Sequence, residues 1–269
     1  MAEEIATAPS SVLLRVAYDG TAFAGFAPQP GQRTVYGVLL DAVRSLDPSV
    51  AALRGASRTD AGVHARDQAV ALDPARAIPA KGWVLGLNAA LPPDVAVRAA
   101  RRVPRGFEPR AHGRGKRYRY QLLVDRVRDP MLERDAWRIG APFDRARAEA
   151  ELTAIVGTHD FRAFRTASDP RIDTTRTLSR ATIVTPRADE PRLLTVEVEG
   201  NAFLHNMVRI IAGSAVDVGR GRLRAGATAR ALASGARTDL GMTAPARGLI
   251  LHDVRLDLPT LGAGDDAWP

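Results

Sequence analysis

The sequence contains no cysteine in its 269 residues. This absence excludes disulfide bonds, thiolate metal sites and a thiol nucleophile. The chain also lacks any stretch of about 20 apolar residues, the length that a membrane-spanning helix requires. Its first ten residues carry Glu3 and Glu4 and lack the basic and apolar regions of a secretory signal. We therefore expect a cytoplasmic protein.

The charge of the chain is unbalanced. Lysine and arginine number 38 and aspartate and glutamate 30, which gives a net charge of +8. A basic protein suits a polyanionic partner such as nucleic acid. Arginine together with abundant alanine and glycine is also what GC-rich coding produces, so the total charge leaves the partner open. The positions of the basic residues in the chain must therefore show whether the partner is a nucleic acid.

Two halves of the chain repeat one order of elements. Before residue 110 the apolar patterns predict a strand, a helix, two strands, a helix and a strand, at 12–18, 35–46, 51–58, 68–73, 81–91 and 95–103. After an arginine- and proline-rich crossing, the same order returns at 118–124, 144–156, 182–185, 194–198, a helix near 203–214, and 249–256. The tail at 261–269 is polar, and we expect it to be loose.

The repeat predicts an α+β protein with an N-terminal half at 1–110 and a C-terminal half at 111–269. Each half is ferredoxin-like or RRM-like. Their antiparallel sheets are expected to join around a central cleft, and a groove between halves is where ligands usually bind. In the helix near 203–214, Phe203 and Met207 share the apolar face, while His205 and Arg209 share another. Asn201 is a suitable N-cap for this helix.

The polar segment 55–65 at the junction of two predicted strands is the most informative part of the sequence. Asp60 is followed by the small residues Ala61 and Gly62, which allow a ligand to approach its carboxylate. Arg58 lies two residues earlier, on the same side of an extended chain. An isolated Asp-Ala-Gly is more often a tight turn in which the aspartate bonds its own backbone.

The longer string favours a functional loop. Gly-x-x-Arg-Thr-Asp-Ala-Gly-Val-His closely resembles the active-site signature of the tRNA pseudouridine synthase A family. The resemblance covers nearly the whole chain and implies the pseudouridine synthase fold. Further matching positions are 18–21, Gly25, Gln29, 34–35, 87–92, Asp94, 116–120, 157–161, Phe164, 201–209 and 246–251.

The resemblance implies a role for individual residues. Asp60 is the nucleophile, Arg209 pairs with it, and Tyr118 stacks on the target base. A guanidinium beside a carboxylate favours its ionised, attacking form. The further substrate-binding residues that the resemblance implies are Arg58, His64, Asn201, Phe203 and Leu251. His64 and His205 are expected to be structural or RNA contacts rather than general bases.

The implied reaction isomerises uridine to pseudouridine. It breaks the bond from ribose to N1 of uracil, turns the base and joins ribose to C5, so no cofactor or metal is expected. The sequence leaves open whether the carboxylate of Asp60 adds to the sugar, adds to the base or first removes a proton from the sugar. The uracil must leave its stack, which costs a few kcal/mol, and stacking on Tyr118 contributes about 1–3 kcal/mol. Tyr118 and Tyr120 alternating with arginines is equally the pattern of an ordinary half-buried strand.

Basic residues crowd the crossing between the halves, where phosphates would position an RNA. A solvated arginine-rich loop is the alternative. The resemblance further implies a homodimer that binds tRNA through the anticodon stem-loop, with uridines at positions 38, 39 and 40 as targets. The basic residues concerned are Arg101, Arg102, Arg105, Arg110, Arg114, Lys116, Arg117 and Arg119.

The match departs from the family in one region. Gly25 is usually followed by Trp-Gln but here by Phe26-Ala27, and Tyr36 replaces an expected Gln. The change affects the details of this loop, including any RNA contact that the missing glutamine side chains would make, and substrate choice could shift.

Two other functions compete with this enzyme. One is an RNA-binding or folding module without catalytic activity. The presence of Asp60, Tyr118 and Arg209 argues against it. The other is a phosphohydrolase with metal at His159-Asp160, which would need more ligands than the chain shows.

Overall fold

The computed structural model describes residues 10–258 and 267–268. The chain forms two compact units, residues 1–114 with 254–269 and residues 115–253. Strand β10 (Leu249–Leu256) begins in the second unit and ends in the first. The division into 1–110 and 111–269 stays a prediction.

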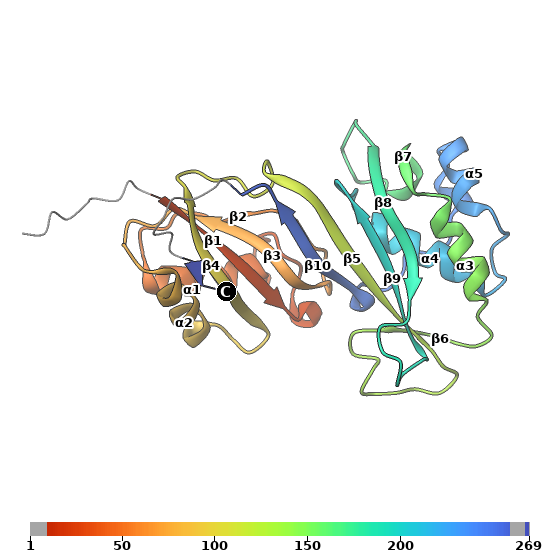
Figure 1. Ribbon diagram of the computed structural model, residues 1–269, viewed down its shortest axis with the longest axis horizontal. Coiled ribbons are helices and arrows are strands. Elements are labelled where there is room, and N and C mark those ends of the chain that lie inside the picture. The colour runs from red at the N-terminus through yellow and green to blue at the C-terminus, as the bar shows by residue number, and fades with distance from the viewer. Residues whose placement is uncertain (1–9, 259–266, 269) are drawn as a thin grey trace, which may run out of the picture. The chain divides into compact units, whose positions relative to one another are not determined.

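The first unit is a sheet with two helices (Figure 1). Its antiparallel strands lie in the order β11-β4-β1-β3, with β2 paired to β3. The elements are β1 (Ser10–Tyr18), α1 (Val35–Leu46), β2 (Arg54–Gly55), β3 (His64–Leu72), α2 (Ala80–Ala90), β4 (Val95–Pro104) and β11 (Ala267–Trp268). The predicted order of elements up to residue 104 is therefore confirmed. The strand predicted at 51–58 is shorter than expected, because only Arg54 and Gly55 pair with β3.

Helix α1 shows why the apolar pattern located these elements well. The hydroxyl of Thr34 accepts a hydrogen bond from the N–H of Gly37 and caps the helix. Val35, Leu39 and Val43 have no exposed surface, so the face with helical spacing is the buried face.

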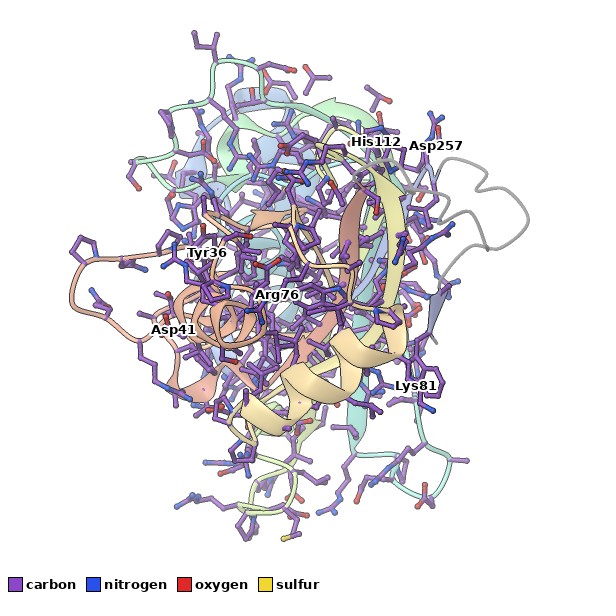
Figure 2. The ribbon with its side chains drawn as sticks, turned by 90° about the vertical axis from the view of Figure 1, so that its left-hand side faces the viewer. Tyr36, Asp41, Arg76, Lys81, His112 and Asp257 are labelled. Atoms are coloured by element: carbon purple, nitrogen blue, oxygen red, sulfur yellow. The ribbon has the colours of Figure 1, made fainter. Side chains whose placement is uncertain are left out.

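The C-terminal tail differs from the expectation of a loose segment. Ala267 and Trp268 pair with Arg101 and Ala100 of β4, so β10 is not the last strand. The ammonium of Lys81, labelled in Figure 2, lies 5.1 Å from the centre of the Trp268 ring. This cation–π contact holds the tail against α2. Residues 261–266 and 269 lie outside the described residues.

The second unit has a sheet in the order β5-β9-β8-β7, with β6 parallel to β5. Helices α3, α4 and α5 gather on one side of β8 and β9 (Figure 1). The strands predicted at 182–185 and 194–198 correspond to parts of β8 and β9 and pair as a hairpin, with Ala181 opposite Val198 and Ile183 opposite Val196. The elements are β5 (Gly113–Val124), β6 (Trp137–Ile139), α3 (Arg145–Thr153), β7 (Gly157–Asp160), β8 (Thr175–Val184), β9 (Leu193–Gly200), α4 (Met207–Gly219) and α5 (Ala227–Ser234).

Helix α4 begins later than its apolar pattern predicted. Asn206 precedes it in the left-handed conformation, with a φ of 62°, so the chain cannot be helical before Met207. Asn201 is not its N-cap; its side chain accepts hydrogen bonds from the N–H groups of Thr177 and Ala202. His205 lies before the helix, and its predicted position on a helical face with Arg209 is wrong.

Candidate active site

Asp60 lies in the loop 56–63, between β2 and β3 of the first unit. It is half-buried, whereas Arg58 is exposed and Thr59 is buried. The N–H of Val63 donates to the carbonyl of Asp60 at 3.1 Å, and Gly62 between them has a φ of 76°. A tight turn therefore follows Asp60, as the Asp-Ala-Gly sequence predicts. The turn is one part of the loop 56–63, which has further contacts.

The backbone of this loop rests directly on the segment 18–26. The N–H of Phe26 donates to the carbonyl of Thr59 at 3.0 Å, and the hydroxyls of Tyr18 and Thr59 are 2.8 Å apart. Gly25 has a φ of +103°, and a Cβ there would lie 2.7 Å from the carbonyl oxygen of Thr59. A Cβ on Gly20 would lie 2.0 Å from the carbonyl oxygen of Val63. Glycine at both positions is thus what lets the two segments meet.

His64 follows the loop and is buried, with 7% of its surface exposed. Its Nδ1 accepts a hydrogen bond from the N–H of Gly20 at 3.1 Å. Asp19 Oδ1 lies 3.2 Å from the same nitrogen. These contacts give His64 a structural part in fixing the end of the loop.

Two of the three residues that depart from the family pattern, Phe26 and Tyr36, contact each other. Their ring centroids are 6.3 Å apart in an edge-on arrangement, and Phe26 also stacks on Tyr18 at 6.5 Å. The Phe26 ring fills the space beside Gly55, where a Cβ would lie 2.5 Å from it. The hydroxyl of Tyr36, which is labelled on α1 in Figure 2, accepts a hydrogen bond from the N–H of Leu53 at 3.1 Å. The two changes therefore form one packing unit beneath β2.

Tyr118 and Phe203 lie together in the second unit. Tyr118 is on β5 opposite Val198 and is 7% exposed. The Phe203 ring meets it edge-on, with the centroids 5.0 Å apart. The two rings form an aromatic cluster in which Tyr118 is mostly buried. Asn201 lies just before Phe203 and ties this segment to β8.

Arg209 is held at the first turn of α4. Its Nε donates to the carbonyl of Ala244 at 2.8 Å, and its Nη1 donates to the side-chain oxygen of Asn206 at 2.6 Å. Burial raises the pKa of Tyr120, and the positive charge of Arg209 opposes that shift. The hydrogen bonds to Ala244 and Asn206 orient the guanidinium of Arg209. Leu251 is fully buried in β10.

Several of the basic residues expected to contact phosphate have acidic partners. Arg119 lies 2.7 Å from Glu197 and hydrogen-bonds to His252, and Arg117 lies 3.7 Å from Glu199 and from Asp253. Arg114 pairs with Asp257, whose N–H donates to the carbonyl of His112 beside it (Figure 2). An RNA phosphate at these arginines would have to compete with those carboxylates.

His159 and Asp160 are both occupied by local contacts. Nε2 of His159 lies 3.1 Å from the carbonyl oxygen of Val156. A hydrogen bond from the Thr174 hydroxyl holds the pKa of Asp160 below its ordinary value, and Arg162 pairs with it at 2.9 Å. Across residues 10–258 and 267–268, no three His, Cys, Asp or Glu side chains are grouped so that they could hold a metal ion. Within the same ranges no helix is long and apolar enough to cross a membrane.

A further site in the second unit was not singled out from the sequence. The loop 165–174 is a network of arginine and aspartate side chains around an exposed isoleucine. Its composition resembles any polar loop, and only its Asp-Pro pair marks a turn. No sequence signal distinguished it from a solvated connection.

Comparisons with known proteins agree with the resemblance. The family model described as tRNA pseudouridine synthase matches residues 15–110 and 152–257. The chain is similar to tRNA pseudouridine synthase A of Citrifermentans bemidjiense, with 40% identity over 91% of this chain and 96% of that protein. It is also similar to the tRNA pseudouridine synthase A of Myxococcus xanthus, with 39% identity over 90% of each chain. This chain therefore belongs to the tRNA pseudouridine synthase family.

Proposed function

We propose that this protein isomerises uridine to pseudouridine in tRNA, with the carboxylate of Asp60 as the nucleophile. Membership of the tRNA pseudouridine synthase family is the observation that carries the reaction. The partial exposure of Asp60 on a loop with a fixed backbone supports its role. A nucleophile must be reachable by the substrate and also held in one direction.

The reaction needs the uracil outside its stack and its ribose within reach of Asp60. Tyr118 stacks on the extruded base, and Phe203 supports the Tyr118 ring from its edge. Arg209 pairs with Asp60 and favours the ionised carboxylate; its bonds to Ala244 and Asn206 support this by orienting the guanidinium.

The remaining residues bind or shape the substrate site. Arg58 is exposed and contacts the RNA backbone or helps to extrude the base. His64 acts through the loop that it holds, and Asn201 through the segment that carries Phe203. Leu251 has no exposed surface, so it acts on the site only through its packing in β10.

The tRNA is engaged through its anticodon stem-loop, with positions 38, 39 and 40 as targets, by a homodimer in the cytoplasm. Similarity to curated tRNA pseudouridine synthases over nine-tenths of the chain supports this part of the proposal. Recognition of RNA by shape and backbone contacts suits such a substrate.

The test is to incubate the protein with unmodified tRNA and a chelator, and to map pseudouridine by position. We expect conversion at positions 38 to 40. Binding without conversion would favour an RNA-binding module, and phosphate release that requires divalent metal would favour a phosphohydrolase. Sedimentation of the protein with and without tRNA measures the dimer.

A further inference from the structure

Ile172 is the most exposed large hydrophobic residue that the structure describes, with a relative exposure of 100%. Met131 and Val127 follow at 85% and 71%. Ile172 lies in the loop 165–174, which leads into β8. A lone exposed aliphatic side chain on a loose loop needs no explanation, but this loop is tightly held.

Asp169 fixes the backbone on both sides of the loop tip. Its side chain has no exposed surface, and its Oδ1 accepts hydrogen bonds from the N–H and Nε of Arg171 at 3.1 and 2.8 Å. Its Oδ2 accepts from the N–H of His205 at 2.8 Å. Arg165 adds hydrogen bonds to the carbonyls of Asp169 and Arg171. The backbone up to Arg171, directly before the exposed Ile172, is therefore held in place.

The same loop is attached to the segment that supports Tyr118. Nη1 of Arg171 donates to the carbonyl of Phe203 at 2.7 Å, and the hydroxyl of Thr166 lies 3.1 Å from Nδ1 of His205. Phe203 in turn packs edge-on against Tyr118. The exposed tip is thus built onto the proposed wall of the base pocket.

Arg176 lies just after the loop, at the second residue of β8, and is 8% exposed. Its Nη1 donates to the carbonyl of Thr175 at 2.5 Å, and Asp173 lies 3.8 Å away. Its Nε is buried and has no hydrogen-bond partner among the described residues. A buried donor without a partner is rare and costly, and a phosphate oxygen is an acceptor that arginine binds well.

We propose that the loop 165–174 engages the RNA strand around the target uridine, and this inference rests on the proposed function. Ile172 enters the base stack at the place that the extruded uracil leaves, and Arg176 binds a neighbouring phosphate. Apolar side chains inserted between base steps replace lost stacking contacts. The benefit is largest when the uridine is paired, because a paired base costs more to extrude.

The test compares the wild type with Ile172→Ala on two tRNA transcripts that differ only opposite the target uridine. One transcript pairs the uridine with adenosine, and the other has a mismatch. We expect turnover of the paired transcript to fall about tenfold, and turnover of the mismatched transcript to change less than about threefold. Val127→Ala, another exposed β-branched residue of the same unit, is the matched control and leaves both rates unchanged.

An equal loss on both transcripts, or no loss on the paired one, overturns the inference. A wild type that forms no pseudouridine contradicts the proposed function itself. An active wild type with an insensitive Ile172→Ala contradicts only the role of the loop. Because Ile172 is fully exposed, its truncation removes no internal packing and leaves the fold intact.

The phosphate contact is tested by the salt dependence of tRNA binding. Loss of one phosphate contact reduces the slope of log affinity against log salt by about 0.7–0.9. We expect this reduction for Arg176→Gln and none for Arg176→Lys, which keeps the charge. Arg147→Gln, an exposed position on α3, is the control. An unchanged slope for Arg176→Gln, or an equal reduction for Arg176→Lys, contradicts the contact.

Discussion

The loop 56–63 carries the proposed nucleophile and the loop 165–174 the proposed RNA contact, and the two loops are held in different ways. The first rests on backbone contacts with Gly20 and Gly25 and on a pair of neutral hydroxyls. The second is held by the charges of Asp169, Arg165 and Arg171. Contacts between backbones do not titrate, whereas carboxylate bonds do. Of the contacts described for the first loop, only that of His64 with Asp19 involves ionisable groups, so we expect the first loop to keep its shape to lower pH than the second.

The largest effect is expected at the nucleophile. Asp60→Asn should reduce pseudouridine formation at least about 1,000-fold while tRNA affinity stays within about threefold, because an amide cannot attack but leaves the RNA contacts in place. Single-turnover assays and filter binding measure the two quantities. Asp41→Asn, an exposed position labelled on α1 in Figure 2, is the control. Substantial turnover by Asp60→Asn would defeat the assignment.

The backbone contact of the first loop is tested at Gly25. Gly25→Ala should lower the free energy of unfolding by about 2–4 kcal/mol and reduce turnover, since it adds both a strained φ and a clash with Thr59. Gly31 has a φ of +69° but nothing within 4 Å of an added Cβ. Gly31→Ala should therefore cost only about 1 kcal/mol and leave turnover unchanged. If chemical denaturation gave the same loss of unfolding free energy for Gly25→Ala and Gly31→Ala, the close contact of Gly25 with Thr59 would not contribute to stability.

The second loop is tested by acid. Burial raises the pKa of Asp169, but hydrogen bonds from His205 and Arg171 outweigh it and hold the pKa below its ordinary value. A lowered pKa stabilises the folded state above the unfolded pKa of about 4, and this contribution is lost as the pH falls through the folded value. Hydrogen-exchange protection factors in 165–174 should fall below pH 4, while those in 56–63 persist. Equal loss of protection in both loops would contradict the contrast.

The smallest effect is expected beneath the first loop. Tyr36→Phe removes the hydroxyl that accepts the Leu53 N–H and should lower the free energy of unfolding by about 0.5–1.5 kcal/mol. Turnover should not change, because the ring packing against Phe26 remains. A clear fall in turnover in the same assays would mean that this packing unit reaches the substrate.

Arg209→Met tests whether the guanidinium of Arg209 favours the ionised form of Asp60. Loss of the guanidinium should disfavour ionised Asp60, so the acidic limb of the pH–rate profile should move to higher pH. An unaltered profile would remove the proposed pairing of Arg209 with Asp60.

Periodicity located the helices and strands whose apolar faces are regular. The helix at 35–46 was predicted with the bounds of α1, and β10 likewise. Periodicity failed where a single backbone angle decided the boundary, as at Asn206 before α4. It also missed α5, whose N-terminus is capped by the buried Glu151, about 75 residues earlier in the chain. A cap from so far away leaves no local pattern to read.

The amino-acid sequence by itself determined the family, the repeated order of elements and the identity of the Asp60 loop, because motifs and apolar spacing are local properties. Only the tertiary structure decided that Gly20 and Gly25 support that loop, that Trp268 pairs back onto β4, and that Ile172 is exposed to solvent. Each of these depends on contacts between residues far apart in the chain. Such contacts arise when the elements pack, and no local pattern encodes them.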